Sequence, residues 1–461
     1  MRPALDASAA RRYLRAMTRL ALPIACQQLT AFLVNLADNV MIGQLGDAAV
    51  SGVYMGSQVH LLLQWCLTGI TAAVSLLAAQ YWGRGDLGAI RRLAGIGFSL
   101  GLPLTLLFLV PSFLAPEAVL SLLTREAGVI RECRQYIPLL ALSFPFFGVS
   151  QLWNSTLRSV EEVRPGMYAA LAALGTNVLL NGLLIFGLFG APALGVRGAA
   201  IATLLSRMLE CGLLTAYLFR RERLLRLRPC HLRPTDSALW KAFLRCGLPV
   251  FAGEVVWALN VMMHNWFMGR YDESAIAAYA MAGLLWEAAL IWVVSMESAA
   301  AILTGKLIGE RRWEELPVYA GSMQVIFLGI GAVTVLGLLA VRRPFLSLYR
   351  VSPAARSLAD RMLWVLLPAM FASIYEDMTL CGIVKQGGSP GFTLAVDCVC
   401  AFGIVLPLSL MVWRLGLPAE VMYAMTVLDQ VLKVVPAAWK VNRLDWARDL
   451  TAPRQEVKGR P

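Results

Sequence analysis

Polar residues inside apolar stretches of the first half of the chain are the first candidates for ion chemistry. Asp38 lies deep in one such stretch, and Asn177 and Asn181 are four residues apart in another. Residues at i and i+4 share one face of a helix. A charge at mid-bilayer costs at least ~2.5–3.5 kcal/mol, so it needs a partner, a cavity or a function. We predict that Asp38, both asparagines and Thr203 form one polar patch. The structural alternative is an aspartate that only bonds the asparagines.

The second half of the chain contains more acid. Glu254 precedes Trp257 by one helical turn, Glu376 and Asp377 are adjacent, and Asp397 lies in a later apolar stretch. Glu254 and Asp397 have no basic residue nearby in the sequence. We therefore predict that these residues contribute to a cation or substrate site.

Two other polar positions in this half have structural alternatives. Asp429 and Lys433 are spaced by four residues, so we expect them to neutralise each other. His264 occupies the place in the second half that Asp38 occupies in the first, and we include it in the candidate site. A lone histidine of this kind is also compatible with a purely structural role.

Composition places these residues in a membrane. Apolar residues make up 58% of the 461 residues, charged residues only 15%, and the mean hydropathy is +0.64. Apolar runs of about 20 residues, long enough to cross ~30 Å of hydrocarbon, recur along the chain. We predict an all-α polytopic protein with about twelve transmembrane helices, at 17–44, 49–82, 93–115, 134–158, 166–190, 195–219, 246–270, 275–308, 317–341, 360–385, 390–415 and 418–440.

The second half of the sequence repeats the first. Leu22-Pro23 recurs as Leu248-Pro249, and the same offset aligns Asn39 with Asn265 and Gly83 with Gly309. We predict an N-terminal six-helix lobe (1–220), a basic cytoplasmic linker (221–245) and a C-terminal six-helix lobe (246–461). An even number of helices per half relates the halves by a pseudo-two-fold axis along the membrane normal, as in transporters that work by alternating access.

The net charge of +12 follows membrane orientation rather than nucleic-acid binding. Arginines gather in alternate breaks between the apolar runs, which predicts cytoplasmic termini by the positive-inside rule. The densest group is Arg220, Arg221, Arg223, Arg226, Arg228 and Arg233. One predicted outer segment breaks the pattern with Arg342, Arg343, Arg350, Arg356 and Arg361. No basic run outside the apolar stretches is interleaved with aromatic residues, so we expect no nucleic-acid partner.

The order and spacing of several motifs resemble the multidrug and toxic compound extrusion (MATE) family, over residues 17 to 445. The motifs are Leu22-Pro23, Asp38-Asn39 with Met41 and Gly43, the run from Gln80 to Asp86, and the run from Gly195 to Thr203. In the second half, Glu254 with Trp257, the run from Gly305 to Gly309, and Gln386-Gly387-Gly388 resemble a prokaryotic branch.

This resemblance implies an antiporter of the bacterial cytoplasmic membrane. Such proteins expel organic, often cationic and amphipathic, compounds in exchange for protons or sodium, and relatives use an acid matching Asp38 for coupling. Polar residues matching Asn177 and Thr203 lie beside that acid. The resemblance implies monomeric action without an obligate protein partner, and we expect no cofactor besides the coupling ion.

The sequence departs from one pattern of the family. Members similar to the DinF type often have an aspartate where this chain has Asn181, and a tyrosine where it has Val34. An amide cannot release a proton, so either Asp38 titrates alone or its carboxylate holds sodium together with the amide oxygens, Asn177 included.

Two other classes of function remain open. A flippase for a lipid-linked precursor has a similar helix layout, but it is expected to use arginines for phosphate, whereas the intramembrane charges here are mostly acidic. A membrane enzyme is disfavoured because His60, His231 and His264 are scattered and no nucleophile–base pair or phosphate loop is present.

Overall fold

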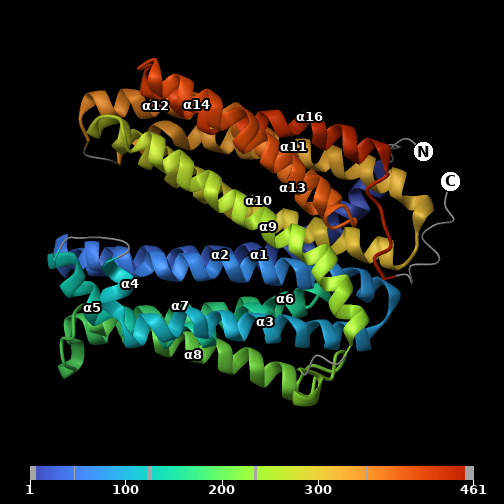
Figure 1. Ribbon diagram of the computed structural model, residues 1–461, viewed down its shortest axis with the longest axis horizontal. Coiled ribbons are helices and arrows are strands. Elements are labelled where there is room, and N and C mark those ends of the chain that lie inside the picture. Colours follow the sequence, from blue (N-terminus) through green and yellow to red (C-terminus); the bar gives the residue numbers. More distant parts are fainter. Residues whose placement is uncertain (1–6, 46, 122–126, 233–235, 349–350, 452–461) are drawn as a thin grey trace. The chain divides into compact units, whose positions relative to one another are not determined.

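The computed structural model describes residues 7–45, 47–121, 127–232, 236–348 and 351–451. Arg233 and Arg350 lie outside these ranges. Every regular element of the described part is helical (Figure 1). A helix satisfies its backbone hydrogen bonds internally, which is why long apolar runs adopt it in a bilayer. Eleven described helices are long and apolar enough to cross a membrane, or twelve if one bent pair counts as a single span. The predicted all-α polytopic fold is confirmed.

The chain divides into two compact units. One consists of Pro23–Gly247, and the other of Met1–Leu22 together with Leu248–Pro461. Both divisions fall within a helix, next to Pro23 and Pro249 respectively. The 22 N-terminal residues therefore group with the second unit.

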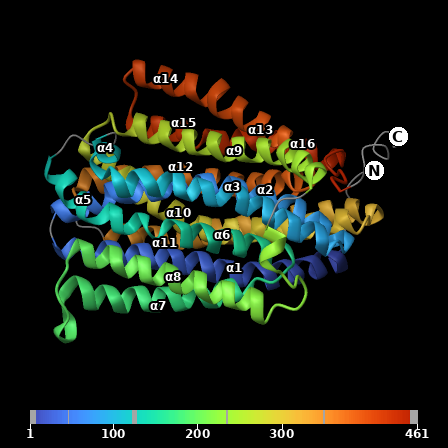
Figure 2. The same ribbon diagram turned by 60° about the horizontal axis from the view of Figure 1, so that its bottom comes forward.

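The first unit contains most of α1 and the helices up to α8. Its elements are α1 (Ala7–Ile42), α2 (Asp47–Arg84), α3 (Leu87–Leu114), α4 (Pro116–Ser121), α5 (Ala127–Ala141), α6 (Phe144–Ser159), α7 (Arg164–Phe186) and α8 (Val196–Arg220), with short 3-10 turns at Gly43–Leu45, Leu188–Gly190 and Pro229–Leu232. Helices α7 and α8 pack along each other, as both views show (Figures 1 and 2). Gly198 permits this approach, because a Cβ atom there would overlap the backbone of Leu184.

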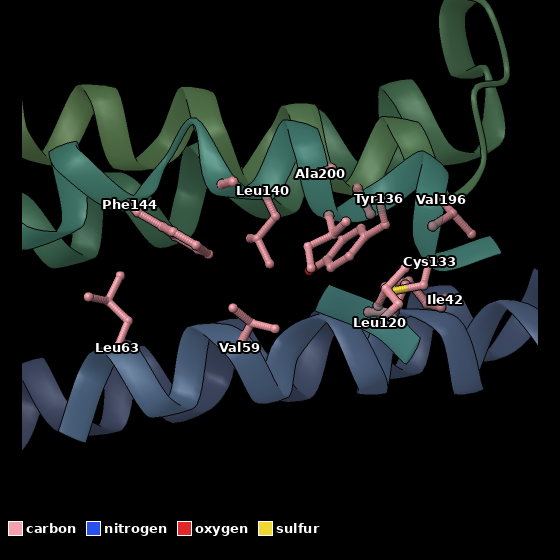
Figure 3. Packing of buried hydrophobic residues seen from close by; sticks show 14 of the residues in the cluster. Ile42, Val59, Leu63, Leu120, Cys133, Tyr136, Leu140, Phe144, Val196 and Ala200 are labelled. Carbon is pink, nitrogen blue, oxygen red and sulfur yellow. The ribbon is translucent and has the colours of Figure 1, made fainter. Parts of the chain in front are cut away.

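A hydrophobic cluster fixes several of these helices together. Figure 3 shows Val59 and Leu63 of α2 facing Tyr136 and Leu140 of α5 and Phe144 of α6. Ile42 at the end of α1 and Val196 and Ala200 of α8 belong to the same cluster. It thus holds α1 and α8, which carry candidate site residues, against a common core.

The second unit contains the first part of α1, α9 from Leu248 and the helices that follow. Its elements are α9 (Ser237–Met268), α10 (Glu273–Gly309), α11 (Leu316–Ser347), α12 (Pro353–Thr379), α13 (Pro390–Cys398), α14 (Leu406–Arg414), α15 (Ala419–Thr426) and α16 (Leu428–Arg443), with a 3-10 turn at Trp313–Glu315. Two π-helical segments, η5 (Leu380–Lys385) and η6 (Val399–Val405), continue α12 and join α13 to α14. Helix α12 packs against α10, α11 and α16.

Several predicted spans are not single α-helices. The span predicted at 134–158 is α5 and α6, bent by 46°. Pro145 lies at the start of α6, where a proline nitrogen needs no hydrogen-bond partner, rather than inside a helix. The spans predicted at 390–415 and 418–440 are likewise interrupted, at η6 and between Thr426 and Leu428. Helix α9 begins at Ser237, so the segment predicted as linker ends in helix.

The segment predicted as a basic outer loop is mostly helix. Arg342 belongs to α11 and Arg361 to α12. The Arg342 side chain is only 6% exposed, pairs with Asp360 at 3.3 Å and lies over the Trp364 ring. Arg361 pairs with Glu420 at 3.3 Å. Arg342 thus links α11 to α12, and Arg361 links α12 to the helix that carries Glu420. These structural pairings account for part of the departure from the positive-inside pattern.

Candidate functional site

The structure joins Asp38 to the two asparagines in a hydrogen-bonded group. Asn181 Nδ2 of α7 donates to Asp38 Oδ1 of α1 and, at 3.0 Å, to Asn177 Oδ1 one turn earlier. Both asparagines are completely buried, and Asp38 is partly buried. The spacing of the asparagines puts them on one face of α7, and that face meets α1 at Asp38.

This group has unused hydrogen-bonding capacity. Asn177 Nδ2 and Asn181 Oδ1 are buried and have no hydrogen-bond partner among the described residues. Most buried polar atoms in proteins are paired, so an unpaired donor and acceptor beside a carboxylate require an explanation. The arrangement suits a ligand that binds and is released again. Such a ligand is either a proton on Asp38 or a small cation held by carboxylate and amide oxygens.

Thr203 does not join the group through its side chain. It is partly buried on α8, and its backbone carbonyl accepts a hydrogen bond from Ser206 Oγ at 2.9 Å. Within the described part of the chain, no hydrogen bond links its hydroxyl to Asp38 or the asparagines.

One turn beyond Thr203, α8 carries an ion pair that sequence reasoning missed. Arg207 Nη1 lies 2.9 Å from Glu210 Oε2, and the Glu210 side chain is 6% exposed. The Arg207 guanidinium lies over the Phe147 ring, which also packs against His60 of α2. The i, i+3 spacing of these opposite charges within an apolar run was the available signal.

The second unit gathers its polar residues around Lys433. Lys433 Nζ of α16 lies 3.0 Å from Asp397 of α13, 3.8 Å from Glu376 of α12 and 3.6 Å from Asp429 of α16. Asp397 has no basic residue nearby in the sequence, but the fold gives it one. Asp429 and Lys433 pair as predicted, and two further carboxylates share the same ammonium group.

Glu254 also has a basic partner. Its Oε1 lies 3.6 Å from Lys385 Nζ, at the end of the π-helical segment η5. These residues are 131 positions apart in the sequence (385 − 254), so no local pattern links them. π-Helical segments occur frequently at functional sites. Glu254, without a local base in the sequence, therefore acquires its basic partner from a distant part of the chain.

The remaining predicted residues lie on α9 and α12, the helices that also carry Glu254 and Glu376. Asp377 accepts a hydrogen bond from Ser373 Oγ at 2.8 Å. Trp257 is 45% exposed on α9. His264, further along α9, has a buried Nε2 atom without a hydrogen-bond partner among the described residues. Asn260, which sequence reasoning missed, donates from Nδ2 to Asp429 Oδ2 at 3.0 Å.

A family model described as MatE matches residues 23–183 and 249–411. The chain belongs to the MatE family. The two matched segments begin at the proline of each repeat, so the model itself recognises the duplication. MatE membership confirms the resemblance inferred from the motifs.

Relatives named "Probable multidrug resistance protein NorM" match over most of the chain. The Neisseria meningitidis serogroup B protein is 26% identical over 375 residues, covering 80% of this chain and 79% of that protein. The Streptococcus pneumoniae serotype 4 protein is 28% identical over 347 residues, covering 74% of this chain and 75% of that protein.

Solved structures share the fold. The Vibrio cholerae MATE transporter VcmN in the bent form has a TM-score of 0.84 at 16% identity, covering 96% of this chain and all of that one. A MOP superfamily transporter from Pyrococcus furiosus, described as having a reversed binding-pocket polarity, has a TM-score of 0.82 at 19% identity, covering 93% and 95%. This MatE protein is thus a multi-pass membrane protein with the transporter fold.

Proposed function

We propose that this chain is a secondary antiporter that exports organic cations across the bacterial cytoplasmic membrane in exchange for protons or sodium ions. The names of its relatives support export of drug-like compounds. The observation that carries the antiport proposal is the carboxylate–amide group of Asp38, Asn177 and Asn181 within membrane-length helices. The protein would act as a monomer, with both termini cytoplasmic and no cofactor besides the coupling ion.

Coupling requires that the ion bind two conformations of the protein with different affinity. Asp38 lies on α1, which bears Pro23 at the point where the chain divides into its two units. A change in the course of α1 would alter the distance between Asp38 and α7, and with it the affinity of the carboxyl group for a proton or sodium. Alternating access would follow from this dependence.

The acids of the second unit support a cationic substrate. Two lysines, Lys385 and Lys433, lie within electrostatic range of a larger set of carboxyl groups, namely Glu254, Glu297, Glu376, Asp377, Asp397 and Asp429. An excess of buried carboxyl groups attracts organic cations, and exposed aromatic faces such as Trp257 add cation–π contacts. A lipid-precursor flippase would instead need basic groups for phosphate.

The test is efflux of ethidium, a fluorescent organic cation, from liposomes that contain the purified protein. A proton gradient and a sodium gradient are applied separately, with protein-free liposomes as the control. Gradient-dependent efflux that the Asp38→Asn variant loses supports the antiporter. Absence of efflux under both gradients, with protein that elutes as a single folded species, would refute organic-cation antiport and move lipid-precursor flipping to the next assay.

A further inference from the structure

Lys433 holds a positive charge at the centre of a carboxylate cage. Glu376 of α12, Asp397 of α13 and Asp429 of α16 approach its Nζ atom to 3.0–3.8 Å. The side chains of Lys433, Glu376 and Asp429 are 8%, 2% and 1% exposed. A cation in this position is surrounded by oxygen atoms and screened from solvent.

The cage has more acceptor capacity than the ammonium group uses. Asp429 Oδ1 and Asn260 Oδ1 are buried, accept no hydrogen bond within the described residues and are not the atoms that pair with Lys433. Hard cations bind carboxylate and amide oxygens of this kind. The same oxygen atoms would therefore suit a small metal cation if the lysine were absent.

Among the described residues, no base other than Lys433 forms an ion pair with a cage acid. Besides the three cage acids, Asp377 of α12, His264 of α9 and Cys400 of η6 lie within its electrostatic range. Lys385 of η5 pairs with Glu254 at 3.6 Å and lies within electrostatic range of Asp397 without forming an ion pair with it. Lys433 is thus the base that contacts all three cage acids directly.

We propose that Lys433 is a tethered cation that fills this carboxylate site in place of a free sodium ion. The inference rests on the proposed antiport and narrows the place where its ion binds. The ammonium group already occupies the oxygen-rich site of the second unit, so the coupling ion, proton or sodium, is left to the Asp38 group of the first unit. The same site becomes a sodium site when the ammonium group is removed.

The experiment measures thermal unfolding of the purified full-length protein in sodium chloride and in potassium chloride of equal concentration. Potassium is an inorganic cation of the same charge and larger radius, so it controls for ionic strength without belonging to the proposed substrate class. Any shift in the wild type reports sodium bound outside the cage, such as at the Asp38 group, and is subtracted from the shift of each variant. Lys433→Met should unfold several degrees higher in sodium, since an ion that binds only the folded state stabilises it.

Two variants control for charge and for burial. Lys433→Arg keeps a tethered cation and should show no sodium effect. Lys440→Met removes another buried lysine of α16, which pairs with Asp445 at 2.8 Å outside the cage, and should also show none. A sodium effect in wild type as large as in Lys433→Met, or a folded Lys433→Met without one, would overturn the proposal.

Removal of one partner from a buried ion cluster is strongly destabilising, so Lys433→Met needs a second variant. Lys433→Met/Asp429→Asn lowers the uncompensated negative charge and keeps Glu376 and Asp397 as ligands. It should regain stability and retain the sodium effect, and loss of that effect would also refute the proposal. The unfolding assay does not depend on transport. If the ethidium assay finds no export but Lys433→Met is still stabilised by sodium, the proposed export is refuted and the assignment of the Lys433 site stands.

Discussion

At the scale of single residues, Asp38 is the acid in a hydrogen-bonded group that otherwise consists of amides. Asn181 donates to it, and neither Asn181 nor Asn177 can release a proton. A two-carboxylate relay is absent from this group, so ion exchange here depends on one carboxyl group.

Asp38→Asn removes the titratable group and keeps its size. We expect ion-driven ethidium efflux to fall at least ~10-fold, since loss of a group that binds the coupling ion removes the driving force rather than the fold. Initial efflux rates in liposomes measure this. Asp86→Asn is the control, because Asp86 caps α3 by accepting from Ala89 N and asparagine caps a helix equally well. Undiminished efflux by Asp38→Asn under both gradients would exclude the role of Asp38.

Asn181→Leu tests the same group through stability. Leucine has a similar size but donates no hydrogen bond, so Asn177 Oδ1 and Asp38 Oδ1 lose their donor. Leaving buried acceptors unpaired costs about 1–3 kcal/mol. We expect a lower midpoint of thermal unfolding than for the wild type, measured by intrinsic fluorescence. An unchanged midpoint would mean that Asp38 and Asn177 do not depend on this amide.

At the scale of elements, the close packing of α7 on α8 depends on one glycine. At Gly198 a Cβ atom would overlap Leu184 of α7, whereas at Gly212, further along α8, nothing lies within 4 Å. The overlapping atoms belong to the backbone, which cannot move aside as a side chain can. The candidate asparagines are on α7, so this contact also sets their position.

Gly198→Ala should therefore destabilise the protein by roughly 1–3 kcal/mol, the usual cost of overpacking. Gly212→Ala is the matched control on the same helix and should be neutral or slightly stabilising, because alanine favours helix. Thermal unfolding of both variants measures the difference. Equal stability of the two would contradict the packing described here.

Interruptions within helices are not predicted by a hydropathy pattern, although the spans that contain them are. The bend between α5 and α6 and the π-helical segments η5 and η6 all lie inside spans predicted as single helices. Composition does not distinguish one long helix from two joined by a break. The position of Lys385 at the end of η5 is a consequence of such a local change in helix type.

At the scale of the whole molecule, arginine distribution predicts which side of the membrane each break faces. Cys230 lies in the basic segment between the two repeats and is exposed, whereas the other cysteines are buried or partly buried. Phe189 lies in the 3-10 turn that follows α7, at the outer end of the span predicted at 166–190, and is 99% exposed. The predicted orientation places these two positions on opposite sides of the membrane.

A membrane-impermeant maleimide should label Cys230 only after cells are permeabilised. Phe189→Cys in a Cys230→Ser background should be labelled in intact cells, and Cys230→Ser alone gives the background from the remaining cysteines. Labelling intensity on a gel measures both positions. Labelling of Cys230 in intact cells would reverse the predicted orientation.

Much of this protein is determined locally along its chain. Apolar runs of membrane length specify helices wherever they fold, because the bilayer leaves the backbone no other partner. The recurrence of Leu22-Pro23 as Leu248-Pro249 reveals the duplication without any knowledge of contacts. Asn177 and Asn181 share a face because helix geometry alone requires it, and the family follows from motifs in order.

The pairing of charges was decided only by tertiary structure. Lys385 and Glu254, or Lys433 and Glu376, are far apart in sequence and meet because separate helices pack together. Sequence spacing reports neighbours on one helix, so it showed Asp429 beside Lys433 and hid the other two carboxylates. Burial strengthens these pairings between helices, because charges attract more strongly in a low-dielectric interior. The nearest opposite charge therefore governs whether a buried acid is free to bind an ion.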